Sequence, residues 1–461
     1  MTPSSIKTMH VAPSGVSKEN PMTTQAVKLL LPRWLITMTP DSPVLEQHAL
    51  AIEGERIAAV LPREEALKRY ADAERVELPN HVLIPGLINA HTHSAMSLLR
   101  GVADDLALMD WLNNHIWPLE RQWVSEDWTY QGSLLSAAEA LRGGVTYLND
   151  MYFFPTAMAR AAVDSGIRAG VSINVIDFPT GYAANAQDYI DKGLAAYEQF
   201  KGEKLLDWTS APHAPYTVSD ETFIQLRELA EKYDLQMHCH IHETQDEIDG
   251  SVKQYGERPL ARLNKLGLLN AKMIAVHMVH LSPDEIDLVA RQGVHLVHNP
   301  SSNLKLASGV APVKALEAAG VNTILGTDGA ASNNRQDMFS EIRAAALLAK
   351  GVTGDPLTVT ARTALEMATV RAAKAMGRAN DLGTLEAGKL ADVVAVALDS
   401  IECQPVYHAD AQLVYVAGRE HVTDVWVGGR QVLSNRNVLT FDTRALLGRV
   451  EDIVAKMRAG R

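Results

Sequence analysis

Hydrophobic and polar positions divide the chain into a long central part and two ends with a different pattern. From about residue 83, short apolar runs alternate with stretches of helical periodicity, which is typical of βα units around a parallel sheet. The runs predicted as strands are residues 83–88, 145–148, 169–175, 206–211, 235–241, 273–276, 294–297 and 323–325. Eight such units predict an α/β fold with a TIM-like (β/α)8 barrel, in which chemistry takes place at the carboxyl ends of the strands.

The two ends of the chain share a pattern of short strands separated by turns. The strands predicted there are residues 28–38, 48–52 and 56–60 at one end, and 391–396, 412–416 and 421–427 at the other. We expect the two ends to pair into one small composite β-sandwich. The predicted organisation is a disordered tail (1–25), the composite β-sandwich (26–82 and 386–440), the catalytic barrel (83–385) and a C-terminal helix (441–461).

Two helix starts within the central part carry capping residues. Ser219 precedes two acidic residues, and Ser282 stands three residues before Glu285, which is the spacing of a capping box. Pro283 follows Ser282 at the first helical position, where proline is favoured. Both serines are therefore predicted to begin helices.

Composition narrows the classes of partner. The 461 residues are 47% hydrophobic and 21% charged, enough for a sizeable core. A formal net charge of -12, without a basic run, argues against nucleic acid or an anionic membrane as partner. Cys239 and Cys403 are the only cysteines, so a disulfide framework is excluded, and neither a membrane span nor a signal-peptide core is present. We expect a cytoplasmic protein that acts on a small molecule.

Histidines and acids gather where the predicted strands end. The first strand leads to His91 and His93, the fourth to His213, the fifth to His238, His240, His242 and Glu243, the sixth to His277 and His280, and the eighth to Asp328. All of these ends lie on the same rim of a (β/α)8 barrel. The pattern therefore predicts one functional site on that rim.

The residue types at this rim suit a hydrolytic metal centre. Such a centre needs three or four protein ligands, an open position for water and a carboxylate that carries protons. His91 and His93 offer two nitrogens, a histidine of the fifth strand a third, and Asp328 an oxygen. Spacing alone does not choose among the fifth-strand histidines, because His238, His240 and His242 share one strand face.

Proton transfer is expected from the acids and the histidine around that centre. Glu243 comes just past the fifth strand and can reach both an activated water and a ring nitrogen of a substrate. His277 is expected to orient or polarise the water. We therefore predict Glu243, His277 and Asp328 as the catalytic residues.

Five segments together resemble the amidohydrolase superfamily, and within it the aromatic-ring deaminases and chlorohydrolases. They are residues 85–93, 240–244, 275–281, 299–306 and 326–334, and the resemblance spans about residues 29–432. It implies a metal-dependent hydrolase barrel with one divalent ion, Zn²⁺ or alternatively Fe²⁺, since no lysine stands in residues 208–212 to bridge two metals. It also maps the family's His-x-x-Glu pattern onto His240 and Glu243, which makes the implied metal ligands His91, His93, His240 and Asp328.

Residues 111–120 and 212–216 resemble the bacterial 5'-methylthioadenosine/S-adenosylhomocysteine deaminases. The resemblance implies that Glu120 holds the ribose hydroxyls, that His213 contacts the nucleoside and that Trp117 lines the substrate pocket. It also implies a homo-oligomer, either a dimer or a tetramer. From the sequence alone, the alternative interpretation of Glu120 is an ordinary acid on a solvent-exposed helix face.

The expected reaction is hydrolytic deamination of a purine nucleoside at C6, with Glu243 carrying a proton to N1 and assisting the loss of ammonia. Relatives that accept S-adenosylhomocysteine can carry arginines after the third strand to bind its carboxylate. Residues 172–190 contain no arginine or lysine. This departure favours 5'-methylthioadenosine, with S-adenosylhomocysteine and adenosine as further candidate substrates.

Three alternatives remain open at this point. The same metal site would serve a guanine- or cytosine-type free-base deaminase or an s-triazine chlorohydrolase, and the surroundings of Glu120 and His213 separate these from a nucleoside enzyme. A third alternative is a catalytically dead scaffold. A scaffold has no need of the complete set of metal-binding and catalytic residues, so the sequence favours an enzyme.

Overall fold

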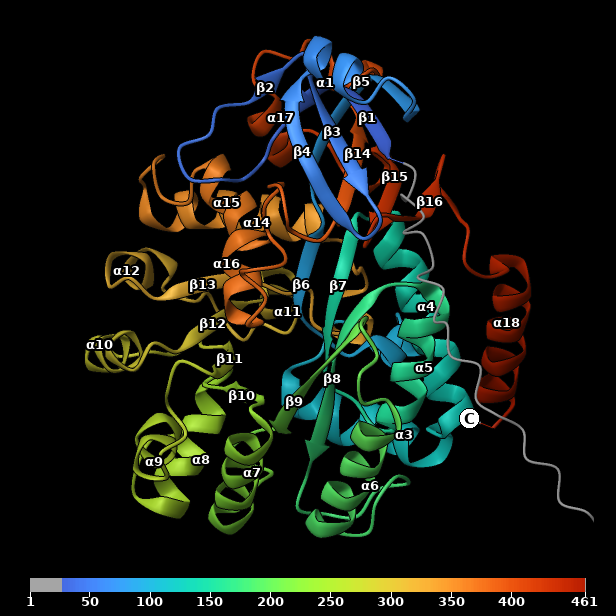
Figure 1. The fold of residues 1–461 in the computed structure, drawn as a ribbon. Helices are drawn as coiled ribbons and strands as arrows, with labels where there is room; N and C mark the ends of the chain where they lie inside the picture. Colours follow the sequence, from blue (N-terminus) through green and yellow to red (C-terminus); the bar gives the residue numbers. More distant parts are fainter. Residues whose placement is uncertain (1–26, 461) are drawn as a thin grey trace, which may run out of the picture.

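A parallel eight-stranded barrel forms the centre of the molecule (Figure 1). The structure, a computed structural model, describes residues 27–460, so the tail predicted for residues 1–25 lies outside the described residues. The barrel strands are β6 (Leu87–Thr92), β7 (Val145–Asp150), β8 (Arg168–Val175), β9 (Leu206–Pro212), β10 (Gln236–Ile241), β11 (Met273–His277), β12 (His295–His298) and β13 (Asn322–Leu325). They pair in this order. The predicted (β/α)8 fold is confirmed.

The barrel closes between its first and last strands at the level of the predicted site. The backbone N–H of Asp328 donates to the carbonyl oxygen of His91 over 3.0 Å, and β13 packs against β6. Strands such as β7 are buried along their whole length, because helices cover the outside and side chains fill the inside. Closure thus brings residues from opposite ends of the barrel sequence into contact.

The prediction that residues 83–88 form the first barrel strand is wrong in one respect. These residues are divided between two strands that lie in different sheets. β5 (Glu74–Pro85) lies in the second sheet, and the barrel strand β6 begins only after Gly86. A Cβ atom at Gly86 would lie 2.0 Å from Oγ1 of Thr146, so glycine is needed where the chain changes sheets. The apolar run is continuous because both strands are buried, and hydrophobicity alone does not mark the change.

The second sheet joins the two ends of the chain. Its nine strands are β1 (Lys28–Leu35), β2 (Leu45–Glu46), β3 (His48–Glu53), β4 (Arg56–Pro62), β5, β14 (Val393–Ala397), β15 (Val422–Val427), β16 (Arg430–Ser434) and β17 (Asn437–Val438). β14 pairs antiparallel with β5. A shared core contains Leu30 and Leu50 from one end and Val393 and Trp426 from the other.

Helices cover the barrel and, in the case of α1, pack against β3 and β4 of the second sheet. They are α1 (Arg63–Arg69), α2 (Leu108–Asp110), α3 (Trp117–Trp123), α4 (Glu126–Arg142), α5 (Pro155–Ser165), α6 (Ala186–Gln199), α7 (Asp220–Tyr233), α8 (Gln245–Tyr255), α9 (Pro259–Lys265), α10 (Pro283–Gln292), α11 (Pro300–Lys305), α12 (Val313–Ala318), α13 (Ala330–Asn333), α14 (Met338–Thr353), α15 (Ala361–Met367), α16 (Val370–Ala375), α17 (Ala409–Tyr415) and α18 (Thr443–Ala459), with short helices η1 (Ser94–Leu99), η2 (Trp111–Ile116), η3 (Ile401–Cys403) and η4 (Arg419–His421). No helix within residues 27–460 is long and apolar enough to cross a membrane.

The structure confirms both predicted helix starts and corrects one predicted strand. Ser219 caps α7, and Ser282 forms a complete capping box with Glu285 at the start of α10. Residues 412–416, predicted as a strand, lie mostly in helix α17. Its buried Leu413 and Val414 pack in a helix that contacts α14 and α15, so tertiary contacts outweigh the strand propensity of this apolar run.

Candidate active site

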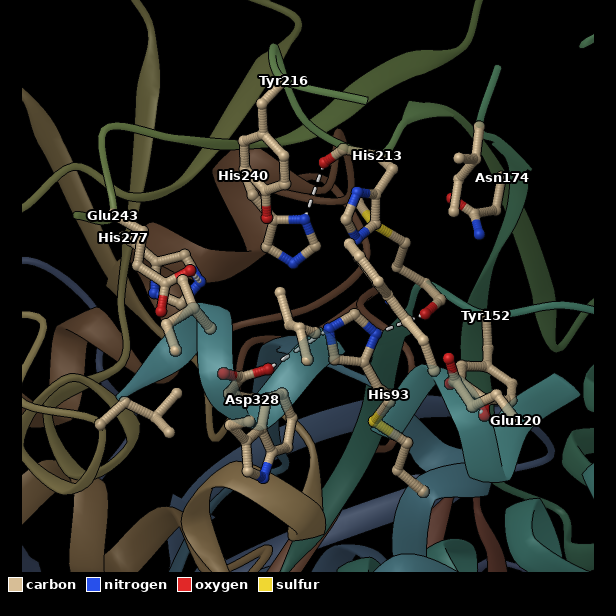
Figure 2. Close-up of a pocket in the computed structure, with 18 of the residues that line it drawn as sticks. His93, Glu120, Tyr152, Asn174, His213, Tyr216, His240, Glu243, His277 and Asp328 are labelled. Carbon is tan, nitrogen blue, oxygen red and sulfur yellow. Dashed lines mark hydrogen bonds and ion pairs between the residues drawn. The ribbon is translucent and has the colours of Figure 1, made fainter. Parts of the chain in front are cut away.

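One cavity at the carboxyl ends of the barrel strands collects the predicted site residues. It has a volume of about 640 Å³ and is lined by His93, Trp117, Glu120, His213, His240, Glu243, His277 and Asp328 among others. His91, the remaining predicted residue, is fully buried and contacts Asp328. Figure 2 shows the side chains of His93, His240 and Asp328 turned toward one another, with Glu120 and Glu243 on opposite sides.

Four side chains bring their free ligand atoms together. Oδ1 of Asp328 lies 3.3 Å from Nε2 of His91 and 3.3 Å from Nε2 of His93. Nε2 of His240 lies 3.3 Å from Nε2 of His91. Three nitrogens and one carboxylate oxygen therefore converge, in the ligand combination that zinc and ferrous ions bind.

The opposite ring nitrogens fix the orientation of these imidazoles. Nδ1 of His93 lies 2.5 Å from the carbonyl oxygen of Met151, and Nδ1 of His240 lies 2.7 Å from that of His213. A carbonyl oxygen only accepts, so each Nδ1 carries the hydrogen and each Nε2 presents a lone pair to the common point. This arrangement fits a divalent metal ion.

The two histidines of β10, His238 and His240, and His242 just after it have different surroundings. His240 joins His91 and His93 in a group that could hold a metal ion. Nε2 of His238 lies 2.9 Å from Nδ1 of His91, behind that ring, and Nε2 of His242 accepts from the backbone of Leu260. The geometry thus favours His240 as the ligand from this strand.

Electrostatics favour neutral imidazoles beside an ionised aspartate. Burial lowers the pKa of His91 to about 4 and that of His240 well below its usual value. Burial acts to raise the pKa of Asp328, but its contact with His91 and the neighbouring imidazoles bring that pKa well below its usual range. Neutral imidazole and ionised carboxylate are the forms that coordinate a metal ion.

Hydrogen bonds hold Asp328 in place. Its Oδ2 accepts from the hydroxyl groups of Ser302, over 2.7 Å, and Ser332, over 2.9 Å, while its Oδ1 accepts from the backbone N–H of Gly329. The two serines come from α11 and α13, the helices that follow β12 and β13. Asp328 is therefore oriented by both of the last strand-end segments.

Glu243 and His277 lie together at the edge of the ligand cluster. Oε2 of Glu243 is 3.5 Å from Nε2 of His277, and the hydroxyl of Ser308 donates to its Oε1 over 3.2 Å. Nδ1 of His277 lies 2.8 Å from Oδ1 of Asn303. Burial raises the pKa of Glu243, and a raised pKa suits a carboxyl group that gives and takes protons near neutral pH.

Glu120 is buried rather than solvent-exposed, so the surface-acid interpretation is wrong. Its side chain lies opposite Glu243 in the cavity, and the hydroxyl of Tyr152 donates to its Oε1 over 2.6 Å. Burial raises the pKa of Glu120 to about 7, although the hydrogen bond from Tyr152 acts in the other direction. A carboxylate here can accept from paired hydroxyl groups of a ligand.

Three polar residues of the cavity wall have no role predicted from the sequence. Tyr152, Asn174 and Tyr216 line it beside the predicted residues. Tyr152 follows the end of β7 by two residues, so its position at a strand end was the available signal. Asn174 lies within β8 and carried no such signal.

A second cavity adjoins the first. It has a volume of about 440 Å³ and shares Trp117, Glu120, Phe153 and Ile176 with the first. The rest of its wall is mostly apolar or uncharged and is formed by Val124, Phe178, Pro179, Thr180, Gly181 and Tyr182, together with Arg121. The four shared residues therefore form a wall common to the site cavity and to a largely apolar side pocket.

Comparison with known proteins gives consistent results. The model of the amidohydrolase family matches residues 82–432. A 5-methylthioadenosine/S-adenosylhomocysteine deaminase of Teredinibacter turnerae is 42% identical over 93% of this chain and 97% of its own length. The crystal structure of an adenosine deaminase from Xanthomonas campestris with bound zinc superposes with a TM-score of 0.93 at 46% identity, covering 95% of this chain and 99% of that one. Atrazine chlorohydrolase from Arthrobacter aurescens, complexed with zinc, has a TM-score of 0.85 at 23% identity over 93% of this chain and 100% of that one, and shares the fold.

Proposed function

Because the chain belongs to the amidohydrolase family, we propose that it is a metal-dependent deaminase that converts 5'-methylthioadenosine to its inosine analogue and ammonia. The full-length similarity to deaminases of this substrate class supports the assignment. The main structural support for this function is one cavity that has buried Glu120 at one side and Glu243 with His277 at the other. A nucleoside spanning the cavity would present ribose to Glu120 and its ring to Glu243.

The metal ion proposed for this site is Zn²⁺, with Fe²⁺ as the alternative. His91, His93, His240 and Asp328 are the proposed ligands, because their free atoms converge and burial lowers the pKa of His91 and of His240. When bound, the ion supplies a Lewis acid that lowers the pKa of a coordinated water molecule toward neutrality. The protein contributes the fixed orientation of the donor atoms through the hydrogen bonds that Nδ1 of His93 and Nδ1 of His240 donate to backbone carbonyl oxygens.

Three residues carry out the proton transfers in the proposed reaction. Asp328 and His277 receive a proton from the attacking water as its oxygen forms a bond to C6 of the purine. Protonated Glu243 donates its proton to N1, takes up the proton of the new hydroxyl group on C6 and delivers it to the exocyclic amine, and the proton first taken from the water then returns to Glu243. The C6–N6 bond breaks, ammonia leaves, and the ring keeps the oxygen as the inosine-type product.

The side pocket supports a nucleoside with an apolar group on C5'. If Glu120 holds the ribose hydroxyls, the 5'-substituent enters the second cavity, which shares Trp117 and Glu120 with the first. A methylthio group suits its mostly apolar wall. Residues 172–190 contain no arginine or lysine, but Arg121 of α3 lines this pocket. Its guanidinium group can bind the carboxylate of S-adenosylhomocysteine. We therefore include S-adenosylhomocysteine in the proposal as a further substrate.

The experiment that tests the function is an ammonia-release assay with a parallel ultraviolet measurement of adenine conversion to hypoxanthine. Zinc-loaded protein is offered 5'-methylthioadenosine, S-adenosylhomocysteine, adenosine, guanine, cytosine and a chlorotriazine. We expect kcat/KM to be highest for 5'-methylthioadenosine. Turnover of a free base or triazine alone would contradict the proposal. The likeness to atrazine chlorohydrolase, at 23% identity, supports the fold alone.

Replacing Glu120 should weaken nucleoside binding selectively. Hydrogen bonds to a charged group contribute about 1.5–3 kcal/mol, so Glu120→Ala should raise KM for 5'-methylthioadenosine by about 10- to 100-fold. Turnover of a free adenine base, which has no ribose, should change much less. Gln122→Ala, an exposed position on the same helix that lines neither cavity, is the control for general disturbance of α3. Equal effects of Glu120→Ala on nucleoside and free base would contradict ribose binding by this residue.

Nucleoside binding should also depend on pH through Glu120. Its pKa of about 7 means that the carboxylate form, which accepts from both hydroxyl groups, is lost as pH falls below 7. The dissociation constant of 5'-methylthioinosine should then rise about tenfold for each further pH unit, while that of hypoxanthine should change less. The ratio of the two constants isolates the ribose contribution. Glu120→Gln should flatten this ratio, and a flat wild-type ratio between pH 5.5 and 8 would contradict the prediction.

The location and assembly of the protein are also proposed. Cys239 and Cys403 are free and buried, which suits a reducing cytoplasm. A dimer or tetramer is proposed in line with the family resemblance. Light scattering of the purified protein measures the assembly directly.

A further inference from the structure

A buried carboxylate outside the proposed chemistry contacts the backbone that carries Glu243. Glu247 lies in the first turn of α8 and is 8% exposed. Its Oε1 accepts from the backbone N–H of His242 over 3.0 Å, and its Oε2 accepts from the backbone N–H of Glu243 over 2.8 Å. Both carboxylate oxygens are therefore used to hold two consecutive residues at the end of β10.

Helix α10 shows what a glutamate in this position ordinarily does. There the N-cap is Ser282, and Glu285, three residues later, accepts from the backbone N–H of Ser282 itself over 2.8 Å, completing a capping box. In α8 the N-cap Thr244 accepts from the backbone of Glu247 in the same way. The carboxylate of Glu247, however, binds the amides one and two residues before its N-cap. The two helices have matching caps, but only the glutamate of α8 binds the backbone amides of His242 and Glu243, whereas Glu285 accepts from Arg258 and lies 3.9 Å from the His242 ring nitrogen Nδ1.

The backbone at this point has a conformation that needs support. His242 has φ of +56°, in the left-handed region that non-glycine residues seldom adopt. The chain turns there from β10 toward α8, and the two successive N–H groups point at one carboxylate, which resembles an anion-binding nest. The bonds to Glu247 satisfy buried donors and stabilise this turn.

We propose that Glu247 is a positioning residue for proton transfer: by binding the amides of His242 and Glu243 it fixes the backbone from which the Glu243 side chain reaches His277. Oε2 of Glu243 lies 3.5 Å from Nε2 of His277, and proton transfer depends on such distances being kept. The inference rests on the proposed function because it takes Glu243 as the proton carrier. It assigns Glu247 no contact with the substrate.

The test compares Glu247→Gln with Glu285→Gln, its matched control in the cap of α10. A glutamine offers one acceptor oxygen, and its NH₂ group faces the second backbone N–H, so one of the two bonds is lost. We expect kcat to fall about 10- to 100-fold in Glu247→Gln, with KM and metal content close to those of the wild type. Glu285→Gln should keep both kcat and KM. Unchanged kcat in Glu247→Gln, or an equal fall in both variants, would overturn the proposal.

Amide hydrogen exchange gives a second measurement that needs neither substrate nor turnover. The peptide containing His242 and Glu243 should exchange faster in Glu247→Gln than in the wild type and in Glu285→Gln. Unchanged exchange there would also overturn the proposal. If Glu247→Gln fails to fold, Glu247→Asp and Glu285→Asp replace the pair, since the shorter carboxylate cannot reach both amides. A wild-type protein without nucleoside turnover would refute the proposed function, while the exchange comparison would still decide whether Glu247 holds this backbone.

Discussion

Glu243→Gln should lower kcat for 5'-methylthioadenosine by about 10³-fold, within the range that a positioned acid and base contributes. Glutamine has nearly the same shape and keeps an acceptor for the hydroxyl of Ser308, which donates to Glu243 in the wild type. It cannot carry a proton to N1 or to the leaving amine. The ligand cluster of His91, His93 and Asp328 is untouched, so metal content should remain that of the wild type.

The measurement is single-turnover and steady-state deamination together with metal analysis of the same sample. Ser308→Ala is the matched control, because it removes the hydrogen bond to Oε1 and leaves the carboxyl group. We expect its kcat to fall much less than that of Glu243→Gln. A Glu243→Gln variant that keeps its metal and turns over within tenfold of the wild type would remove Glu243 from the proton-transfer role.

The barrel was predictable because its signals are repeated and local. Apolar runs alternate with capped helices, and the ends of the strands carry histidines and acids in sequence order. Residues such as His91 and Asp328 are far apart in the chain, but barrel closure joins the backbone N–H of Asp328 to the carbonyl oxygen of His91. The fold rule that collects strand ends on one rim was therefore enough to predict that they would meet.

Features that depend on tertiary contacts could not be predicted from the sequence. The change of sheet at Gly86 follows from its close approach to Thr146, and α17 follows from packing against α14 and α15. Neither contact is visible in a local pattern, because a buried apolar run reads alike in either sheet or in a helix.

The roles of some buried polar residues also depend on tertiary contacts that the sequence does not reveal. The burial of Glu120 and its bond with Tyr152 depend on packing between α3 and the end of β7. Glu247 has the spacing of an ordinary capping glutamate, and only the structure shows that its carboxylate reaches His242 and Glu243 instead. Sequence patterns thus predicted which side chains meet in one cavity, whereas the contacts that orient those side chains are evident only in the three-dimensional structure.

Removing the metal ion should abolish deamination and destabilise the folded protein together. In the absence of a cation, the lone pairs of His91, His93 and His240 face one another and Asp328 in a buried site, where unpaired polar groups are costly. An ion present at about 1,000 times its Kd would add about 4 kcal/mol to the free energy of unfolding. Chelation should therefore leave no measurable turnover and lower the Tm.

Titrating Zn²⁺ or Fe²⁺ back into the chelated protein should restore activity at one equivalent, with the Tm rising in parallel. His93→Ala, which removes one donor, should lose both responses. His298→Ala is the control, because His298 is a buried histidine near the barrel rim that belongs neither to the group of His91, His93 and His240 nor to that of His91, His277 and Asp328, the two groups of potential ligands found within residues 27–460. Full activity after exhaustive chelation, or restoration only at two equivalents, would contradict a single metal ion held by these four residues. The two readouts together separate a loss of catalysis from a loss of folding, since His298→Ala is expected to lower the Tm without changing metal stoichiometry.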